Sequence, residues 1–102
     1  QIPDFSECPI LYYLVMYNNQ FTTYKSGSFK SITQIRYIDL GGNSLTQTSV
    51  NQIISDLYDN YLTAPRSNVT INLAGGSNAA PSGDAVDLIT ILESNNWDIR
   101  SN

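Results

Sequence analysis

The sequence predicts an α/β fold, a short solenoid of about four parallel strands with helices on its convex side. Three observations support this prediction. An apolar pattern recurs at a fixed spacing, several short segments alternate apolar and polar residues as strands do, and the later segments carry helical periodicity. The 102 residues also match the usual size of one domain. We therefore interpret residues 1–102 as a single repeat domain.

The first part of the chain, residues 1–45, contains two copies of a 24-residue repeat. Sliding residues 5–21 onto residues 29–45 aligns residues of the same kind at every key position. The pairs are Phe5 with Phe29, Cys8 with Ile32, Leu11 with Ile35, Leu14 with Ile38, Met16 with Leu40, Asn19 with Asn43 and Phe21 with Leu45. Such self-similarity is the signature of a repeat architecture.

Each copy has the spacing L-x-x-L-x-L-x-x-N-x-L, with other apolar residues at some leucine positions. Alternation within it predicts a strand that buries Leu14 and Met16 in the first copy. This spacing resembles the leucine-rich-repeat family. The resemblance implies that Asn19 and Asn43 bond backbone groups where each strand ends and stack as rungs of an asparagine ladder.

A third unit is longer, and we assign it to residues 46–80. Val69, Ile71 and Leu73 alternate like the earlier strands, and Gly76 takes the place of the asparagine. The added length contains apolar residues at helical spacing, which predicts a helix over 48–61 with Thr48 or Thr46 as its N-cap. The residues on that apolar face are Val50, Ile53, Ile54, Leu57, Tyr58 and Tyr61.

The last segment, residues 81–102, is predicted to form a capping helix and strand. Ser82 is the expected helix cap, and Asp84 lies in the acidic first turn that follows. Ala85, Ile89 and Leu92 are expected to face inward, and the helix should end near Asn95. A final strand, Trp97 to Arg100, would turn Trp97 into the core to seal the exposed end of the array.

The tail carries a second resemblance. The run from Val69 to Gly83, followed by a helix and Asn96-Trp97-Asp98-Ile99, resembles the endings of bacterial surface proteins and bacteriophage tail or fibre proteins. There a Gly-Trp pair often precedes the last strand, and Asn96 replaces that glycine here. The resemblance implies an extracellular, cell-surface or virion location, and a homo-oligomer as one form of assembly.

The N-terminal end carries no comparable seal in the sequence. Residues 1–5 match the second half of a repeat whose strand would lie upstream. We therefore expect the solenoid to continue into a larger parent protein.

Composition and residue types favour binding over catalysis. The chain has no histidine, which removes histidine-based triads and metal sites, and we expect no catalytic residue, cofactor or metal. Cys8 is expected to pack in the core, as its repeat partner Ile32 would. Asp56, Asp59, Asp84 and Asp87 are interpreted as residues of solvated helix faces and caps.

Two Gly-Gly pairs, one at Gly41-Gly42 and one at Gly75-Gly76, are interpreted as turns that end strands, because neither fits the spacing of a phosphate-binding loop. The net charge of −4 argues against nucleic acid as a partner. No run approaches the roughly 20 apolar residues that cross a bilayer, so membrane insertion is not expected.

Outward side chains of the stacked strands would form a candidate ligand-binding face. The expected rows are Tyr13, Tyr37 and Thr70; then Val15, Asp39, Asn72 and Asp98; then Tyr17, Gly41, Ala74 and Arg100. Tyrosine offers a flat area with a polar tip, and Asp and Asn offer directed hydrogen bonds, which suits sugars, peptides or protein loops. Equally, exposed tyrosines are common on strands for packing reasons alone.

Two functions follow from these patterns. The first is a non-catalytic recognition or adhesion module, the C-terminal domain of a larger phage tail-fibre or cell-surface protein that binds a host-surface glycan or protein. The alternative is a structural capping or assembly domain of a filament or virion protein, which contacts copies of itself or its parent. An enzymatic role would require a catalytic domain elsewhere in the parent protein.

Overall fold

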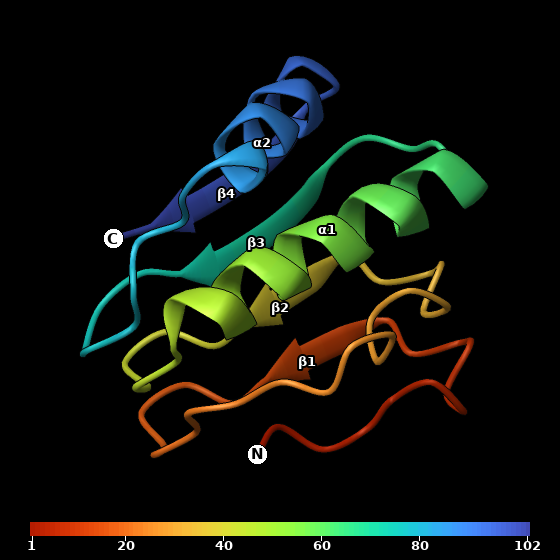
Figure 1. The fold of residues 1–102 in the computed structure, drawn as a ribbon. Helices are drawn as coiled ribbons and strands as arrows, with labels where there is room; N and C mark the ends of the chain where they lie inside the picture. Colours follow the sequence, from red (N-terminus) through yellow and green to blue (C-terminus); the bar gives the residue numbers. More distant parts are fainter.

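Four short strands lie side by side in chain order, and every neighbouring pair is parallel (Figure 1). The computed structural model describes residues 1–102. The elements are β1 (Tyr13–Val15), β2 (Tyr37–Asp39), α1 (Gln47–Thr63), β3 (Val69–Leu73), α2 (Asp84–Ser94) and β4 (Trp97–Ser101). The predicted α/β class with about four parallel strands and helices is therefore confirmed.

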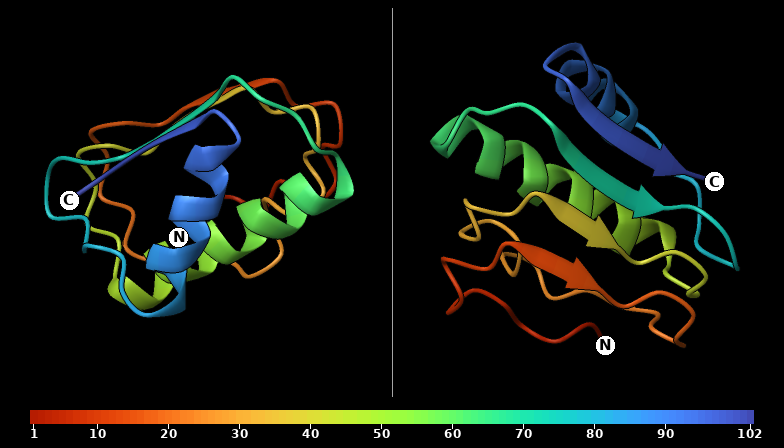
Figure 2. Two further views of the ribbon diagram at one scale, coloured as in Figure 1. Left: turned by 90° about the horizontal axis from the view of Figure 1, so that it is seen from above. Right: turned by 180° about the vertical axis from the view of Figure 1, so that it is seen from behind.

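Both helices cover the same face of the sheet. Viewed from above, α1 and α2 lie below the strands, and viewed from behind, the strands face the reader with no element in front of them (Figure 2). The core lies between these two layers, and the opposite face of the sheet is left open. Neither helix has the length and apolar character that crossing a bilayer requires.

The alternation of apolar residues explains the strands. At the centre of the sheet, Leu14, Ile38, Ile71 and Ile99 lie in register and point toward the helices. Their neighbours along each strand point to the open face, as the burial pattern of β3 shows by alternating buried and half-buried residues. One continuous apolar row therefore crosses the sheet from β1 to β4.

Helix α1 follows the predicted periodicity, with its N-cap at Thr46. The Thr46 hydroxyl accepts a hydrogen bond from the Ser49 N–H at 3.2 Å. Of the predicted apolar positions, Val50, Ile53, Ile54 and Leu57 are buried, and Tyr58 and Tyr61 are half-buried. Each fully buried aliphatic side chain stabilises the fold by about 1.5–3 kcal/mol relative to an exposed one.

The cap of α2 differs from the prediction. The N-cap is Gly83, which has no side chain to bond the first turn, so Ser82 as the cap is wrong. The side chain of Ser82 is instead held by α1, because its hydroxyl accepts a hydrogen bond from the Asn51 amide at 3.1 Å. At the other end of this segment, Trp97 is buried and its Nε1 donates to the Arg66 carbonyl at 2.8 Å.

Cys8 is exposed, so its predicted place in the core is wrong. Its repeat partner Ile32 is fully buried, since α1 lies over that turn and the Asn60 amide donates to the Ile32 carbonyl at 3.1 Å. The turn that holds Cys8 lies at the β1 end of the sheet, beyond the reach of either helix (Figure 1). Equivalent positions in the repeat therefore differ in burial because their neighbours differ.

Asp56 is buried, which corrects its assignment to a solvated helix face. Its Oδ2 accepts hydrogen bonds from the Tyr24 hydroxyl at 2.7 Å and the Gly27 N–H at 2.6 Å, and its Oδ1 accepts one from Gln52 at 3.0 Å. Burial and the adjacent Asp56 carboxylate raise the pKa of Tyr24 far above its usual range. Tyr24 is therefore a neutral donor that ties the segment between β1 and β2 to α1.

Replacing Tyr24 with phenylalanine is expected to lower the free energy of unfolding by about 1–3 kcal/mol. The ring would be retained, but the Asp56 carboxylate would lose a donor, and the Phe29 N–H would lose the hydroxyl that it bonds at 2.7 Å. Urea unfolding followed by Trp97 fluorescence measures this change. The Tyr58→Phe variant is the matched control, and an equal loss in both variants would contradict the assignment.

Candidate functional site

The open sheet face carries two rows of outward side chains. The first row is Tyr13, Tyr37, Thr70 and Asp98, and the second is Val15, Asp39, Asn72 and Arg100. The predicted rows placed Asp98 beside Asn72 and Arg100 beside Ala74, which is wrong by two residues. A shift of two keeps the same side chains on the same face, so alternation alone could not distinguish the two registers.

Two tyrosines stack at the β1 side of this face. The ring centroids of Tyr13 and Tyr37 are 4.6 Å apart, and the rings are inclined by only 17°. Tyr13, on the outer strand, is 60% exposed. Each ring therefore covers one face of the other, and the pair presents its outer ring faces and edges, held in place by ring-on-ring contact.

Asp39 fixes the polar side chains around this aromatic pair. Its Oδ2 accepts a hydrogen bond from the Tyr37 hydroxyl at 3.2 Å, and its Oδ1 accepts from the Gly41 N–H at 2.9 Å and the Asn72 amide at 3.0 Å. Partial desolvation and the Asp39 carboxylate raise the pKa of Tyr37, which keeps its hydroxyl protonated. Asn72 is itself oriented, because its Oδ1 accepts from the Ala74 N–H at 3.0 Å.

A shallow hollow of about 370 Å³ lies beside Asp39, where β1, β2 and β3 end. It brings together three of the predicted site residues, Tyr17, Asp39 and Asn72. Gly41 and Ala74 of the predicted third row also line it, and the lining is completed by residues that sequence patterns did not indicate as site residues, which are Asn18, Gly42, Gly75 and Gly76. The signal was present, since both glycine pairs follow strands that neighbour each other, but Gly42, Gly75 and Gly76 were interpreted only as turn residues.

The β4 side of the face is charged and open to solvent. Arg100 and Asp98 form an ion pair with 3.0 Å between Nη2 and Oδ2, and both side chains are more than half exposed. Exposed pairs of this kind contribute little to stability. The predicted site residues therefore fall into an aromatic group near β1, a fixed polar group at β2 and β3, and a charged pair on β4.

Asn43 lies under the turn that follows β2 and is 1% exposed. Its amide donates to the carbonyls of Met16 at 3.1 Å and Leu40 at 2.9 Å, which directly follow the neighbouring strands β1 and β2. Its Oδ1 accepts from the Phe21 N–H at 3.1 Å. One side chain thus satisfies backbone groups of two consecutive units, which parallel strands leave unpaired where they end.

Asn78 makes the same contacts one unit further along. Its amide donates to the carbonyls of Leu40 at 2.9 Å and Leu73 at 3.2 Å, and its Oδ1 accepts from the Leu45 N–H at 2.9 Å. The sequence alignment placed Gly76 at this position, which is wrong. The Gly-Gly turn after β3 adds two residues, so the asparagine that fills the role follows later in the chain.

Asn19 occupies the first of the three positions and is exposed. Its amide donates to the carbonyls of Met16 at 3.1 Å and Tyr17 at 3.2 Å, both within its own unit. Asn19 therefore closes its own turn but, unlike Asn43, bridges no second strand.

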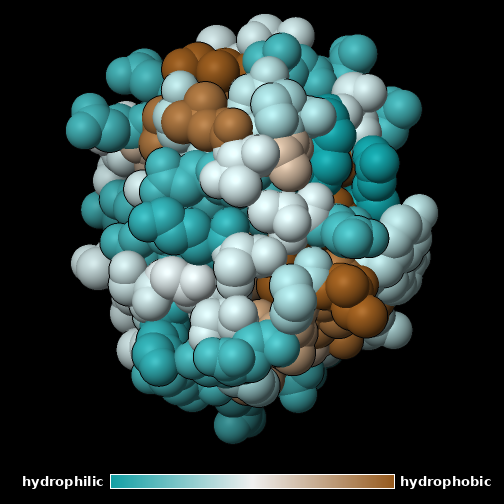
Figure 3. All heavy atoms as spheres, turned by 90° about the vertical axis from the view of Figure 1, so that its right-hand side faces the viewer, coloured by the Kyte–Doolittle hydropathy of each residue, from teal (hydrophilic) through white to brown (hydrophobic).

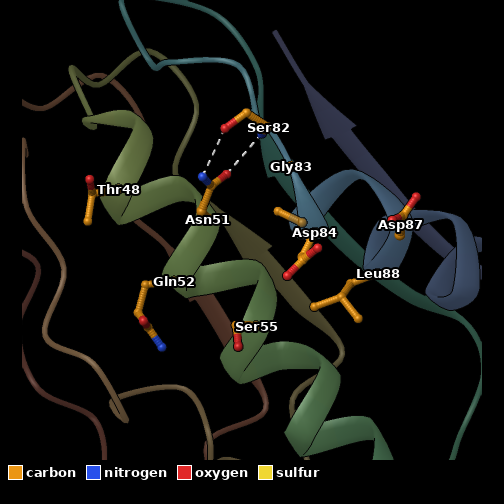
Figure 4. Close-up of a pocket in the computed structure, with 10 residues that line it drawn as sticks. Thr48, Asn51, Gln52, Ser55, Ser82, Gly83, Asp84, Asp87 and Leu88 are labelled. Carbon is orange, nitrogen blue, oxygen red and sulfur yellow. Dashed lines mark hydrogen bonds between the residues drawn. The ribbon is translucent and has the colours of Figure 1, made fainter.

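A larger open groove, about 720 Å³ in volume, separates the first turns of the two helices (Figure 4). Asn51 of α1 and Ser82 face each other across it, with the amide donating to the hydroxyl at 3.1 Å and the Ser82 N–H donating to Asn51 Oδ1 at 3.0 Å. Asp84 and Asp87 border the groove in the first turn of α2, where acidic residues stabilise a helix. These residues are explained by helix attachment and helix stability.

The fold and the surface define an α/β domain whose all-parallel sheet presents one open face of aromatic and polar side chains. No cluster of three or more His, Cys, Asp or Glu side chains forms that could hold a metal ion. Comparisons with known protein families, with curated proteins and with solved structures found no match for this chain.

Proposed function

We propose that this chain is the C-terminal end of a leucine-rich-repeat solenoid and that it serves as a non-catalytic recognition module. The repeat assignment is supported by the 24-residue spacing, by the strands that stack in register, and by Asn43 and Asn78, which bond the ends of successive strands. The helices on one face leave the other face of the sheet open for binding.

The observation that carries the recognition proposal is the fixed group formed by Tyr37, Asp39 and Asn72 beside the exposed ring of Tyr13. A sugar ring can stack on the tyrosine surface while its hydroxyl groups bond the carboxylate and amide at the edge of the hollow. These polar groups are already held by hydrogen bonds, so little conformational entropy is lost when a ligand binds. A host-surface glycan is the ligand that this chemistry suits best, and a protein loop is the second.

The proposal assigns no catalytic step to the chain. Both oxygens of Asp39 and both oxygens of Asp56 are engaged in hydrogen bonds, and the sequence has no histidine to act as a base beside them. The net charge of −4 does not favour nucleic acid. The proposed setting is a larger phage tail-fibre or cell-surface protein, exposed outside the cell or on the virion.

Replacing Tyr13 with serine is expected to weaken glycan binding by about tenfold or more, because it removes the exposed aromatic ring on which the sugar is proposed to stack. Glycan arrays identify the ligand, and titration calorimetry with the best glycan measures the loss. Tyr12→Ser is the matched control, since Tyr12 is 59% exposed but lies just outside the two rows of the face. Equal loss in the two variants, or binding to neither glycans nor host cells by the unmodified protein, would refute the proposal.

The alternative function, an assembly or capping domain, is supported by a different region. The outer edge of β1 is unpaired and lies among partly exposed apolar side chains, as expected of a surface that meets another chain or segment. Under this alternative, substitution of Tyr13, Tyr37 and Asp39 together would leave adsorption to host cells unchanged. Substitutions along the helices, or of the partly exposed apolar side chains beside the outer edge of β1, would instead abolish assembly of the parent particle.

A further inference from the structure

β4 is the free edge of the sheet at the end that α2 covers (Figure 2). It has five residues, it pairs with β3 alone, and no strand lies beyond it. The outer backbone groups of this strand therefore have no strand to bond. Unpaired edges of this kind are templates for a strand of another chain.

The hydrogen bonds of β3 determine which backbone groups of β4 are free. The Thr70 N–H donates to the Arg36 carbonyl at 3.0 Å, on the side of β2. Because alternate residues of a strand bond opposite neighbours, Ile71 bonds β4, where its register partner is Ile99. A residue of a parallel pair bonds the two residues that flank its register partner, so the residues on either side of Ile99 bond β3. The backbone groups that point to the free edge alternate with these, and they belong to Trp97, Ile99 and Ser101.

Apolar side chains of α2 lie beside this edge. Ala85 and Leu92 are buried and mark the flank of α2 that faces the core, and Leu88 borders the groove toward α1. Helical geometry places Val86 and Ile89 on the flank away from α1, toward the outer side of β4. Val86 is 48% exposed, and Ile89 is half-buried. In Figure 3, apolar atoms gather near the top of the molecule, at the end that α2 and β4 occupy in Figure 1.

The exposed side chains of β4 have opposite charges two residues apart. Asp98 and Arg100 flank Ile99, the middle residue of the strand, and both are more than half exposed. When two β4 strands run antiparallel with Ile99 opposite its own copy, Asp98 of each strand lies opposite Arg100 of the other. A parallel pair in register would instead place like charges opposite each other. The charges of β4 therefore favour an antiparallel copy of the same strand, because opposite charges across a strand pair are stabilising and like charges are not.

The free backbone groups agree with the same arrangement. In an antiparallel pair centred on Ile99, hydrogen bonds are exchanged by Ile99 with its copy and by Trp97 with Ser101 of the other strand. These are the residues whose backbone groups point to the free edge. Asp98 and Arg100 then form non-hydrogen-bonded pairs, in which the side chains approach most closely. Charge and hydrogen bonding thus select the same register independently.

We propose that two copies of this chain form a symmetric dimer by pairing their β4 edges antiparallel about Ile99, so that the two sheets become one continuous sheet. The two-fold axis is then perpendicular to the sheet, and both α2 helices lie on one side of it. Val86 and Ile89 of the two copies cover each other across the axis. Both open faces point to the other side, so the dimer presents the recognition surface twice. That last consequence rests on the proposed function, whereas the dimer itself does not.

Sedimentation equilibrium over a range of chain concentrations tests for the dimer. We expect the unmodified chain to pass from monomer to dimer and no further. Asp98→Arg and Arg100→Asp each place like charges opposite one another at both cross-strand pairs. Each is therefore expected to raise the dissociation constant by about tenfold or more. Because both side chains are exposed, the variants should remain folded, which Trp97 fluorescence measures.

Two rescues identify the register. The double variant Asp98→Arg with Arg100→Asp restores opposite charges at both pairs, and it should dimerise as the unmodified chain does. An equimolar mixture of the two single variants should form a heterodimer, because each strand then has the charges that complement the other. Hydrogen exchange gives an independent readout. The Ile99 amide is expected to exchange about tenfold or more slowly in the dimer, whereas the Asp98 amide, which bonds β3, is protected in both states.

Several outcomes would overturn the proposal. One is a chain that stays monomeric at millimolar concentration, and another is a dimer whose dissociation constant neither charge reversal changes. Failure of both rescues would refute the register. Assembly that continues beyond two copies, with the Ile99 amide protected, would identify the β1 edge of another copy as the occupant. None of these measurements uses a glycan, so a failure of the proposed recognition function would leave them unaffected.

Discussion

Replacing Asn43 with alanine is expected to lower the free energy of unfolding by about 2–4 kcal/mol, because a buried polar group left without a partner costs about 1–3 kcal/mol and a lost hydrogen bond about 1 kcal/mol more. The Phe21 N–H loses its acceptor, whereas the carbonyls of Met16 and Leu40 each lose one donor and keep a second, from Asn19 and Asn78 respectively. These backbone groups lie under the turn, where rearrangement would have to separate two strands. Urea unfolding monitored by Trp97 fluorescence measures the loss.

Two further variants separate the roles of this side chain. Asn43→Asp keeps an acceptor for the Phe21 N–H but turns a carboxylate toward two carbonyls, so it should destabilise at least as much as alanine if the donor role dominates. Asn19→Ala is the matched control and should cost less than about 1 kcal/mol, because its bonds are exposed. Equal losses for Asn19→Ala and Asn43→Ala would show that the bridging contacts do not stabilise the fold.

The strands and α1 could be predicted because their information is local. Alternation identified Leu14, Ile38 and Ile71 as the buried row, and helical spacing identified the buried face of α1. These patterns report which side chains a backbone conformation places on one face. They do not report how many residues a turn contains, so the asparagine of the third unit was placed at Gly76 instead of Asn78.

Neighbours that are distant in sequence decided the remaining positions. Cys8 and Ile32 occupy the same place in the repeat, yet only Ile32 lies under α1. Asp56 was predicted to be solvated because it lies on the polar side of its helix. In the structure, Tyr24 and Gly27 of the segment between β1 and β2 donate hydrogen bonds to its carboxylate. No pattern within one segment indicates such a contact.

The candidate binding face was predicted in composition but not in detail. The residues of both rows do lie on the open side of the sheet, since alternation fixes the face of each strand. The stack of Tyr13 on Tyr37 and the anchoring of Asn72 by Asp39 depend on strand register and side-chain rotamers. The hollow beside them depends on the conformation of two glycine turns, which spacing alone does not describe.

Replacing Gly76 with alanine is expected to lower the free energy of unfolding by about 3–4 kcal/mol, through two effects that add. The backbone φ of Gly76 is +58°, a conformation that costs an alanine about 1–2 kcal/mol. A Cβ at this position would also lie 2.7 Å from the Gly42 Cα and 2.8 Å from the Asn43 carbonyl oxygen. These atoms belong to the backbone of the preceding turn, so relieving the contact would move β2 and β3 apart, with an overpacking cost of about 1–3 kcal/mol.

Gly83→Ala isolates the first of these effects. Its φ of +57° matches that of Gly76, but a Cβ there would have no atom within 4 Å. We therefore expect only a conformational cost, of about 1–3 kcal/mol, because the ψ of −133° places Gly83 outside the left-handed helical region, in a conformation that is essentially restricted to glycine. The difference between the two variants in urea unfolding measures how closely consecutive turns pack at the strand ends.

Because these turns also border the hollow beside Asp39, Gly76→Ala should weaken ligand binding even where the protein remains folded, whereas Gly83→Ala should not. Equal destabilisation by both variants would mean that the turns can separate without cost, and the close stacking of units would then contribute nothing to stability.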